Sequence, residues 1–324
     1  MMSGMAVLIC VDAKRILEFA IRLGALSLEI VGAFKDSISE ELQKVRPHAG
    51  QIEVARALRG IVSSSRLLKD RADLKELRGV HSTGVREIST IIQGVYSFRC
   101  IPQILGPVLD SLRKSEKDVK IEINSVTDNP IVDVKHKLFL HGGNFHGDYI
   151  ATSMDQLKIG LVKLTLLSER RINFFLNTNI NKAFPPFINL LKPGLTLALQ
   201  GLQFVATSTT AQSQTLAYPH SLHSISTNSD NQDVVSMGTD AALLASKVID
   251  NVYILLTIEL VTLLQAVDHL RNEKKLSLPS QRLYRLARKV FPKIKEDRVI
   301  ISELDQLKNF IQNQSEFNNT IFKL

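Results

Sequence analysis

The chain has 324 residues, of which 44% are hydrophobic, so it can bury a large core as one large domain or two ordinary ones. Its 16 glycines and 10 prolines are too few for a collagen-like or disordered chain. The formal net charge of +8 is modest for this length and does not by itself indicate nucleic acid as a partner. Two cysteines, Cys10 and Cys100, are too few for a disulfide framework and form no Cys-x-x-Cys pair, which predicts a reducing, cytoplasmic setting.

The first part of the chain shows helical periodicity with one interruption. Apolar side chains mostly three and four residues apart predict a long helix over 5–34. The sequence RPHAG at 46–50 predicts a turn, because proline restricts the residue before it and glycine tolerates positive φ. A shorter helix is expected over 51–64, a charged surface excursion over 68–84, and another helix over 102–122.

The rest of the chain alternates loops and longer helices. The region 124–147 is rich in turn-forming residues, and its short apolar patches predict a small hairpin. Helical patterns follow over 149–176, 195–217, 234–271, 280–291 and 303–313. There is no internal repeat and no alternation of strands and helices, so we predict an all-α fold of long antiparallel helices in a bundle. Its central part is expected over 1–272, and a C-terminal helical extension of the same domain over 273–324.

The most hydrophobic stretch, residues 252–264, raises the alternative of a membrane span. Glu259 interrupts it, and Asp250 and Asp268 bound it, whereas a span needs about 20 apolar residues. The N-terminal sequence also lacks the basic segment of a signal peptide. We therefore predict a helix buried in a bundle and no membrane association.

Familiar catalytic motifs are absent from the sequence, among them the Walker phosphate loop, the dinucleotide fingerprint and the Gly-x-Ser-x-Gly elbow. A metal site is one alternative, because histidines recur five residues apart in one loop and three apart in another. These are His136, His141, His146, His220 and His223. The five-residue spacing does not bring ligands together on a helix or strand and no cysteine accompanies it, so ordinary loop histidines and no metal are the favoured interpretation.

A nucleic-acid-binding face is a second alternative, on the helix expected over 280–291. Basic residues recur there at helical spacing, at Arg282, Arg285, Arg288 and Lys289. A solvated helix face is the favoured interpretation, and no nucleic-acid partner is expected.

The stretch QGVYSFRCIPQ at 93–103 has a more unusual polar pattern. Gln93, Tyr96 and Arg99 recur every three residues and would project from one side of a helical turn. An arginine binds a carboxylate through paired charge-assisted hydrogen bonds, an amide can donate beside it, and a phenol can relay a proton or orient an oxyanion. A binding site for a carboxylate and a buried structural network both account for this pattern.

Three further polar clusters accompany it: TDNP at 127–130, GGNFHG at 142–147 and NQDVVSMG at 231–238. Together the four motifs resemble, in the same order, those of the aromatic amino acid ammonia-lyase and aminomutase family, which includes the histidine, phenylalanine and tyrosine ammonia-lyases. The resemblance extends over essentially the whole chain. The combination is highly specific, although no single motif is.

The resemblance implies a long-helix bundle that assembles as a homotetramer, with each active site built from several subunits and with no metal or added coenzyme. The family's electrophile, methylidene-imidazolone, forms from an Ala-Ser-Gly triplet upstream of an Asn-Gly motif. This sequence contains no Ala-Ser-Gly, and its Ser3-Gly4 matches the Asn-Gly motif with serine in place of asparagine. The chain therefore resembles the C-terminal portion of a family member, and we expect it to lack the electrophile and the upstream tyrosine that takes the β-proton.

The resemblance also implies roles for individual residues. Arg99 matches the arginine that clamps the substrate carboxylate, and Tyr96 matches the catalytic tyrosine beside the electrophile and the α-amine. Gln93 and Asn129 match amides that support the carboxylate and the electrophile region.

Three further matches concern the region around the substrate side chain. Phe145 matches an aromatic residue close to the electrophile and substrate, and Gln200 a pocket position that varies between substrate classes. Gln232 stands where histidine-specific members carry glutamate and phenylalanine or tyrosine enzymes carry glutamine. A glutamate can pair with an imidazole, whereas a neutral amide suits an uncharged ring or a phenol, so Gln232 favours phenylalanine or tyrosine as the substrate.

Two kinds of function are therefore expected. The first is non-oxidative elimination of ammonia from an aromatic amino acid. Histidine ammonia-lyase or aromatic 2,3-aminomutase activity is an alternative, because lyase and mutase share this machinery. The chain is expected to be inactive alone, since it lacks the electrophile segment. The second is a non-catalytic helical scaffold that associates with itself or with a complementary N-terminal partner chain.

Overall fold

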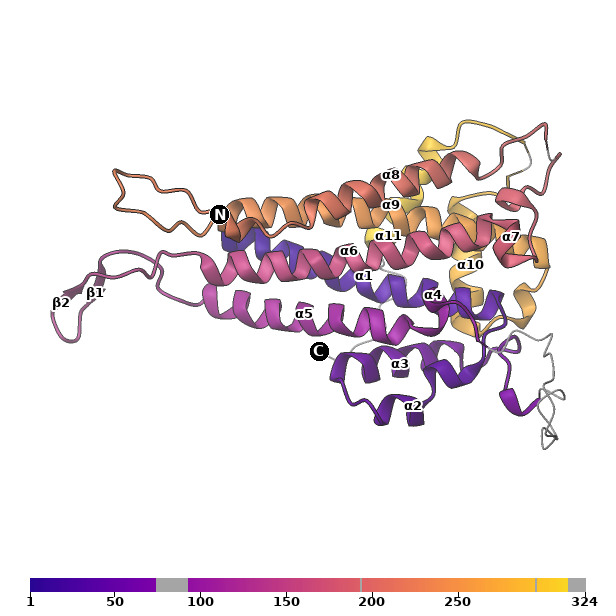
Figure 1. The fold of residues 1–324 in the computed structure, drawn as a ribbon, viewed down its shortest axis with the longest axis horizontal. Helices are drawn as coiled ribbons and strands as arrows, with labels where there is room; N and C mark the ends of the chain where they lie inside the picture. The colour runs from indigo at the N-terminus through magenta and orange to yellow at the C-terminus, as the bar shows by residue number, and fades with distance from the viewer. Residues whose placement is uncertain (74–92, 193, 295, 314–324) are drawn as a thin grey trace, which may run out of the picture.

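The structure, a computed structural model, describes residues 1–73, 93–192, 194–294 and 296–313. Long helices run side by side in an elongated bundle (Figure 1). They are α1 (Met2–Ile30), α5 (Ile101–Glu122), α6 (Asp148–Leu176), α8 (Gln200–Leu216) and α9 (Gly238–Leu270). The predicted all-α, long-helix fold is confirmed.

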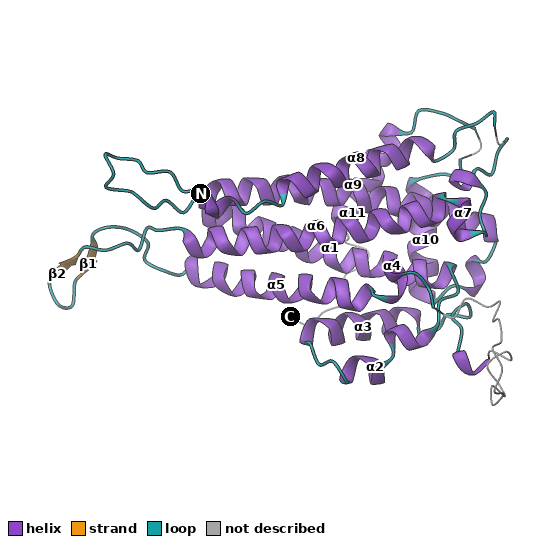
Figure 2. Ribbon diagram, viewed as in Figure 1, coloured by secondary structure: helices purple, strands orange, loops and turns teal. Residues whose placement is uncertain are grey.

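Shorter elements cover one side and one end of this bundle. They are α2 (Glu40–Lys44), α3 (Ala49–Val62), α4 (Tyr96–Arg99), α7 (Thr178–Asn181), α10 (Leu278–Val290) and α11 (Ile301–Asn313). Figure 2 shows the predicted hairpin as two short strands, β1 (Ile131–Asp133) and β2 (Leu138–Leu140). They pair antiparallel, with Ile131 opposite Leu140. The hairpin projects beyond the end of the bundle at which the N-terminus lies (Figure 1).

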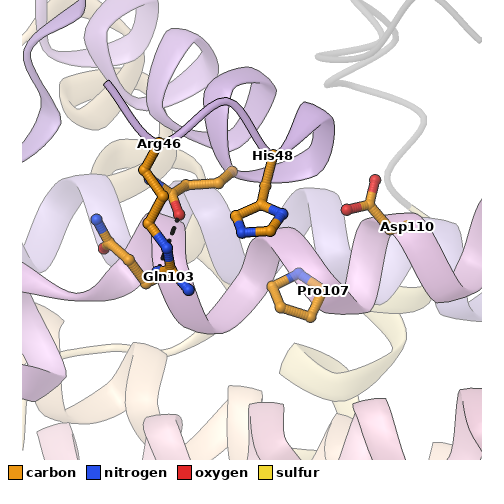
Figure 3. A pocket seen from close by; sticks show the side chains of 6 residues that line it. Arg46, His48, Gln103, Pro107 and Asp110 are labelled. Carbon is orange, nitrogen blue, oxygen red and sulfur yellow. Dashed lines mark hydrogen bonds between the residues drawn. The ribbon is translucent and has the colours of Figure 1, made fainter. Parts of the chain in front are cut away.

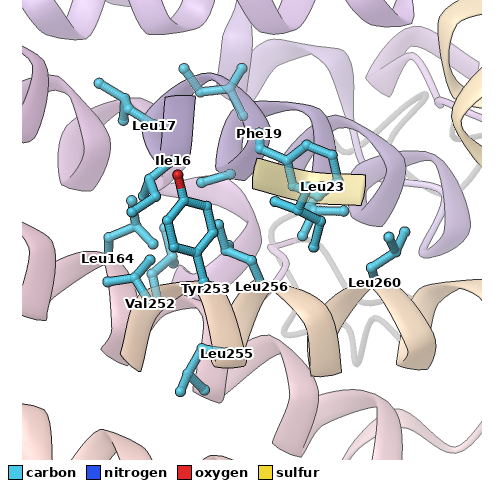
Figure 4. Close-up of a cluster of buried hydrophobic side chains, with 14 of the residues drawn as sticks. Ile16, Leu17, Phe19, Leu23, Leu164, Val252, Tyr253, Leu255, Leu256 and Leu260 are labelled. Carbon is cyan, nitrogen blue, oxygen red and sulfur yellow. The ribbon is translucent and has the colours of Figure 1, made fainter. Parts of the chain in front are cut away.

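The core lies where α1, α6 and α9 face one another. Figure 4 shows side chains of all three helices meeting there, among them Ile16, Leu164 and Leu256, each 1% exposed or less. Burial on more than one face, as predicted for 149–176, is observed along α6. By length and composition α9 could cross a membrane, but it is mostly buried in the bundle, where Glu259 pairs with Arg171 of α6. It is a core helix.

Two local expectations need correction, and the structure leaves a third untested. No helix was expected between those predicted over 5–34 and 51–64, but α2 lies there, because the Ser39 hydroxyl accepts a hydrogen bond from the Leu42 amide and caps this short helix. Gln93 lies before α4 in a bend, and not on a helical turn with Tyr96 and Arg99. The surface excursion expected over 68–84 lies mostly outside the described residues.

The basic stripe on α10 is also less solvated than expected. The Arg288 side chain is only 10% exposed, because its guanidinium donates to Asp268 Oδ2 at 2.6 Å. Arg285 pairs with Glu273 at 2.7 Å. These two arginines therefore bind carboxylates of the protein itself.

Candidate functional site

The first group of predicted site residues lies on α4 and at the start of α8. Phe98 points into the core and packs edge-on against Phe174, with ring centroids 4.8 Å apart, near the C-terminal end of α6. This contact anchors the turn and leaves its neighbours Tyr96 and Arg99 toward the surface. The Arg99 guanidinium carbon lies 4.7 Å from the Tyr96 ring centroid, a cation–π contact.

The Arg99 guanidinium retains unused hydrogen-bonding capacity. Its Nε is buried and has no hydrogen-bond partner within the described part of the chain. The Tyr96 side chain beside it is 68% exposed. A buried N–H donor without a partner carries a free-energy cost that an anionic ligand would remove.

Gln200 lies at the same end of the bundle. It is the half-buried first residue of α8, and one turn later Gln203 Nε2 donates to Asn173 Oδ1 of α6 at 3.2 Å. This hydrogen bond satisfies the side-chain amide of Gln203, which is half-buried on α8. Just before α8, the amides of Leu197 and Ala198 donate to the Asp297 carboxylate at 2.7 and 3.2 Å. Asp297, which sequence patterns did not indicate, therefore fixes the turn that positions Gln200.

A second group lies at the opposite end of the bundle, in the loops that precede α6 and α9. Asn129 Oδ1 accepts a hydrogen bond from the Gly142 amide at 3.0 Å and so closes the base of the hairpin. Phe145 is 53% exposed, and Gln232 is exposed in the loop before α9. His146 Nε2 lies 3.0 Å from the Val234 carbonyl oxygen and so connects the two loops.

The two groups are far apart within one chain. The 29 residues of α6 span about 44 Å, and the groups lie near its two ends. Figure 1 shows α4 toward one end of the bundle and the loops before α6 and α9 at the other. The structure thus brings Tyr96 next to Arg99, and the loop of Phe145 next to that of Gln232. It does not join the two groups in a single chain, and the roles assigned to these residues stay predictions.

Three long helices begin at the end where the second group lies. The Met2 side chain packs between Gly147 and Gly238: a Cβ atom at Gly147 would lie 2.7 Å, and one at Gly238 2.2 Å, from the Met2 sulfur. A larger residue at either position would displace the Met2 side chain, so the two glycines make room for Met2 where α1, α6 and α9 start. None of the three N-termini has a side-chain cap, so their positive dipole ends favour a negative charge nearby. Ser3 and Gly4 lie in the first turn of α1.

A buried ion pair anchors the loop that carries Gln232. The Lys158 side chain is 0% exposed, and its ammonium donates to Asp155 Oδ1 at 2.7 Å and to the Tyr218 carbonyl at 2.9 Å. Asp155 Oδ2 accepts a hydrogen bond from the Ser221 amide at 2.9 Å. Burial raises the pKa of Asp155, but these hydrogen bonds outweigh it and hold the pKa below its ordinary value. The sequence carried no signal of this pair, because Lys158 reads as a solvent-facing residue.

The described residues contain no group of three or more histidine, cysteine, aspartate or glutamate side chains that could hold a metal ion. Several of the histidines considered above have other contacts. His136 lies 2.7 Å from Asp133, and the rings of His220 and His223 pack edge-on at 5.0 Å.

Comparison with known proteins places this geometry in a family. The family model described as "Aromatic amino acid lyase" matches residues 1–289. The chain is 33% identical over 313 residues to a tyrosine 2,3-aminomutase of Myxococcus sp. (strain Mx-B0), covering 96% of this chain and 59% of that protein. It is 34% identical over 312 residues to a histidine ammonia-lyase of Caldanaerobacter subterraneus subsp. tengcongensis, covering 96% and 58%.

Solved structures agree with the sequence comparison. The tyrosine aminomutase from Streptomyces globisporus superimposes with a TM-score of 0.93 at 34% identity, covering 99% of this chain and 61% of that chain. The chain belongs to the aromatic amino acid lyase family, whose members here include ammonia-lyases and aminomutases. It spans about three fifths of the length of these relatives.

Proposed function

We propose that this chain supplies the carboxylate-binding part of an active site that eliminates ammonia from an aromatic amino acid. The observation that carries the proposal is the Arg99 guanidinium, with a buried and unpartnered Nε and the Tyr96 ring beside it. Arg99 binds the substrate carboxylate through charge-assisted hydrogen bonds. The Tyr96 phenol orients or accepts a proton near the α-amine, and Gln93 and Asn129 support the carboxylate and the reacting region.

Gln232 supports phenylalanine or tyrosine as the substrate, with Phe145 and Gln200 beside the substrate side chain. A neutral amide accommodates an uncharged ring without a buried, unpaired charge. Relatives named tyrosine 2,3-aminomutase and histidine ammonia-lyase match at similar identity, so transfer of the amine to the β-carbon and elimination from histidine are the alternatives.

The residues present do not fit an electrophile formed within this chain. The 324 residues contain no Ala-Ser-Gly, the triplet from which the family's methylidene-imidazolone arises. We therefore propose no catalytic step through that group here, and we propose that the isolated chain is inactive. The N-termini of α1, α6 and α9 converge beside the second group of residues. Their positive dipole ends support the proposal that a negatively charged group binds there.

Further copies of this chain would complete the active site by bringing the two groups of residues together. A second copy lying antiparallel to the first would bring Arg99 of one toward Gln232 of the other, across the length of α6. α8 suits such contacts, since it has no charged residue and exposes Phe204 and Val205 at 66% and 46%. We propose a homo-oligomer, a tetramer as the family resemblance implies, with an N-terminal partner chain as a further candidate, in the cytoplasm.

The test is complementation. The chain would be purified alone and then mixed with the N-terminal portion of the tyrosine 2,3-aminomutase from Myxococcus sp., and formation of the unsaturated acid from phenylalanine, tyrosine or histidine would be followed by ultraviolet absorbance. We expect activity only in the mixture. Arg99→Lys should then raise KM about tenfold or more, while Arg56→Lys, an exposed change on α3, should have no effect.

Unchanged kinetics in Arg99→Lys would refute the role of Arg99. An inactive mixture, with light scattering that shows a defined oligomer of the chain alone, would favour the non-catalytic scaffold.

A further inference from the structure

A small polar hollow lies between the N-terminus of α3 and the first half of α5. Its volume is about 280 Å³. It is lined by Arg46, His48, Gln51, Gln103, Pro107 and Asp110. None of the seven predicted site residues lines it, so the proposed lyase chemistry does not account for these side chains.

The polar groups at this hollow have unmet hydrogen-bonding capacity. Gln103 Oε1 is buried and has no partner among the described residues. Pro107 lies inside α5 and has no N–H, so the backbone carbonyl of Gln103, four residues earlier, lacks its helical donor. The His48 ring and the Asp110 carboxylate make no hydrogen bond or ion pair with the described part of the chain. Both of these side chains are exposed, so they are accessible to solvent and to a ligand.

The charges lie on two sides of the hollow. Figure 3 shows Arg46 beside Gln103 on one side and Asp110 on the other, with the His48 ring and Pro107 between them. The one hydrogen bond of the Arg46 guanidinium there, to Gln51 Oε1, is long at 3.5 Å. Arg46 and Asp110 therefore do not neutralise each other, and each remains able to bind a charge of opposite sign.

The backbone frame around the hollow is tightly packed. A Cβ atom at Gly50 would lie 2.2 Å from the Gly106 carbonyl oxygen and 2.8 Å from the Asp110 carboxyl carbon. The first turn of α3 and α5 therefore approach each other closely beside Asp110. His48, the N-cap residue of α3, makes no side-chain cap, so the dipole of this 14-residue helix adds to the positive side of the hollow.

We propose that this hollow binds a small zwitterion of the free amino acid class, separately from the substrate site. Arg46, with the N-terminus of α3, binds the carboxylate, and Asp110 binds the ammonium group. A simple anion would leave Asp110 unpaired, and a simple cation would lie beside Arg46. A molecule with both charges satisfies both sides.

The test uses the full chain and saturation-transfer difference NMR, with L-alanine as the probe because it carries both charges and little else. Propionate lacks the ammonium group and L-alaninamide lacks the carboxylate. We expect L-alanine to bind at millimolar concentration, and each of these two half-ligands to bind at least about tenfold more weakly. Arg46→Gln and Asp110→Asn should each weaken L-alanine binding about tenfold or more.

Two controls separate this site from the proposed substrate site. Arg56→Gln removes an exposed arginine elsewhere on α3 and should leave binding unchanged. In Arg99→Lys, the part of the L-alanine signal that depends on Arg46 and Asp110 should remain, because it does not come from the proposed substrate site. Circular dichroism melting curves establish that each variant is folded. Absence of L-alanine binding, equal binding of propionate, or loss of that part of the signal in Arg99→Lys would each overturn the proposal. These outcomes do not depend on whether the complemented enzyme is active.

Discussion

Arg171 on α6 and Glu259 on α9 form a two-point ion pair inside the bundle. Arg171 Nε lies 2.5 Å from Glu259 Oε1, and Nη2 lies 3.0 Å from Oε2. Both side chains are 1% exposed, and the Ser168 hydroxyl donates a further hydrogen bond to Glu259 at 2.6 Å. Each charged group lost its hydration on burial, and the opposite charge of its partner replaces that hydration.

Removal of one partner of this ion pair should therefore lower the free energy of unfolding more than removal of both. We expect Glu259→Leu to lower the free energy of unfolding by about 3–5 kcal/mol, because the Arg171 charge stays buried without its partner. In the double variant Arg171→Met/Glu259→Leu, the free energy of unfolding should fall by less than in Glu259→Leu. Urea denaturation followed by circular dichroism measures the wild type, Glu259→Leu, Arg171→Met and the double variant. A double variant as unstable as the sum of the two single variants would contradict this account.

The contact between α3 and α5 gives a paired prediction on one helix. A Cβ atom at Gly50 would lie 2.2 Å from the Gly106 carbonyl oxygen, whereas one at Gly60 would have no atom within 4 Å. We expect Gly50→Ala to destabilise the protein by about 1–3 kcal/mol through overpacking. Gly60→Ala should stabilise it by up to about 1 kcal/mol through helix propensity. Thermal melting of both variants compares them, and equal effects would refute the close approach of the two helices.

Asp155 gives a prediction about pH. Its pKa is held below the ordinary value of 3.8, because hydrogen bonds from Lys158 and the Ser221 amide outweigh the opposing effect of burial. An acid with a lowered folded-state pKa stabilises the fold above its unfolded pKa, and this stability is lost as the pH falls through the folded-state pKa. Asp155→Asn should therefore be less stable than the wild type at pH 7, and the difference should shrink as the pH falls below about 3.8.

Urea unfolding at a series of pH values measures this difference. Amide hydrogen exchange at Ser221 should be faster in Asp155→Asn, since the loop loses its anchor. A stability difference that does not change with pH would show that the charge of Asp155 is not responsible.

Cys10 should be inert in the folded protein. It is 4% exposed, and burial, with Glu116 nearby, raises the pKa of its thiol to about 12. Relative to an ordinary thiol, its thiolate fraction at pH 8 falls on the order of a thousandfold, and only the thiolate reacts. In Cys100→Ser, we expect no reaction of Cys10 with a disulfide reagent until urea unfolds the chain. Rapid labelling of the native variant would contradict the burial of this residue.

Local sequence pattern was enough to predict most helices of this protein. The helices expected over 149–176 and 234–271 agree closely with Asp148–Leu176 and Gly238–Leu270, because apolar residues repeat with the period of the α-helix. The proximity of Tyr96 and Arg99 could also be predicted, since residues three positions apart in a helical turn are neighbours. Gln93 departs from that pattern because the helical turn begins only at Tyr96.

The tertiary structure decided which distant residues meet. Arg171 and Glu259 are 88 positions apart, and nothing in the period of either helix specifies that these two polar groups face each other. The division of the predicted site residues between the two ends of α6 likewise depends on which loops pack together, as the contact of His146 with the Val234 carbonyl shows. Helical periodicity is set by neighbours a few residues away. The pairing of helix faces and loops is set by packing and charge compensation across the whole bundle.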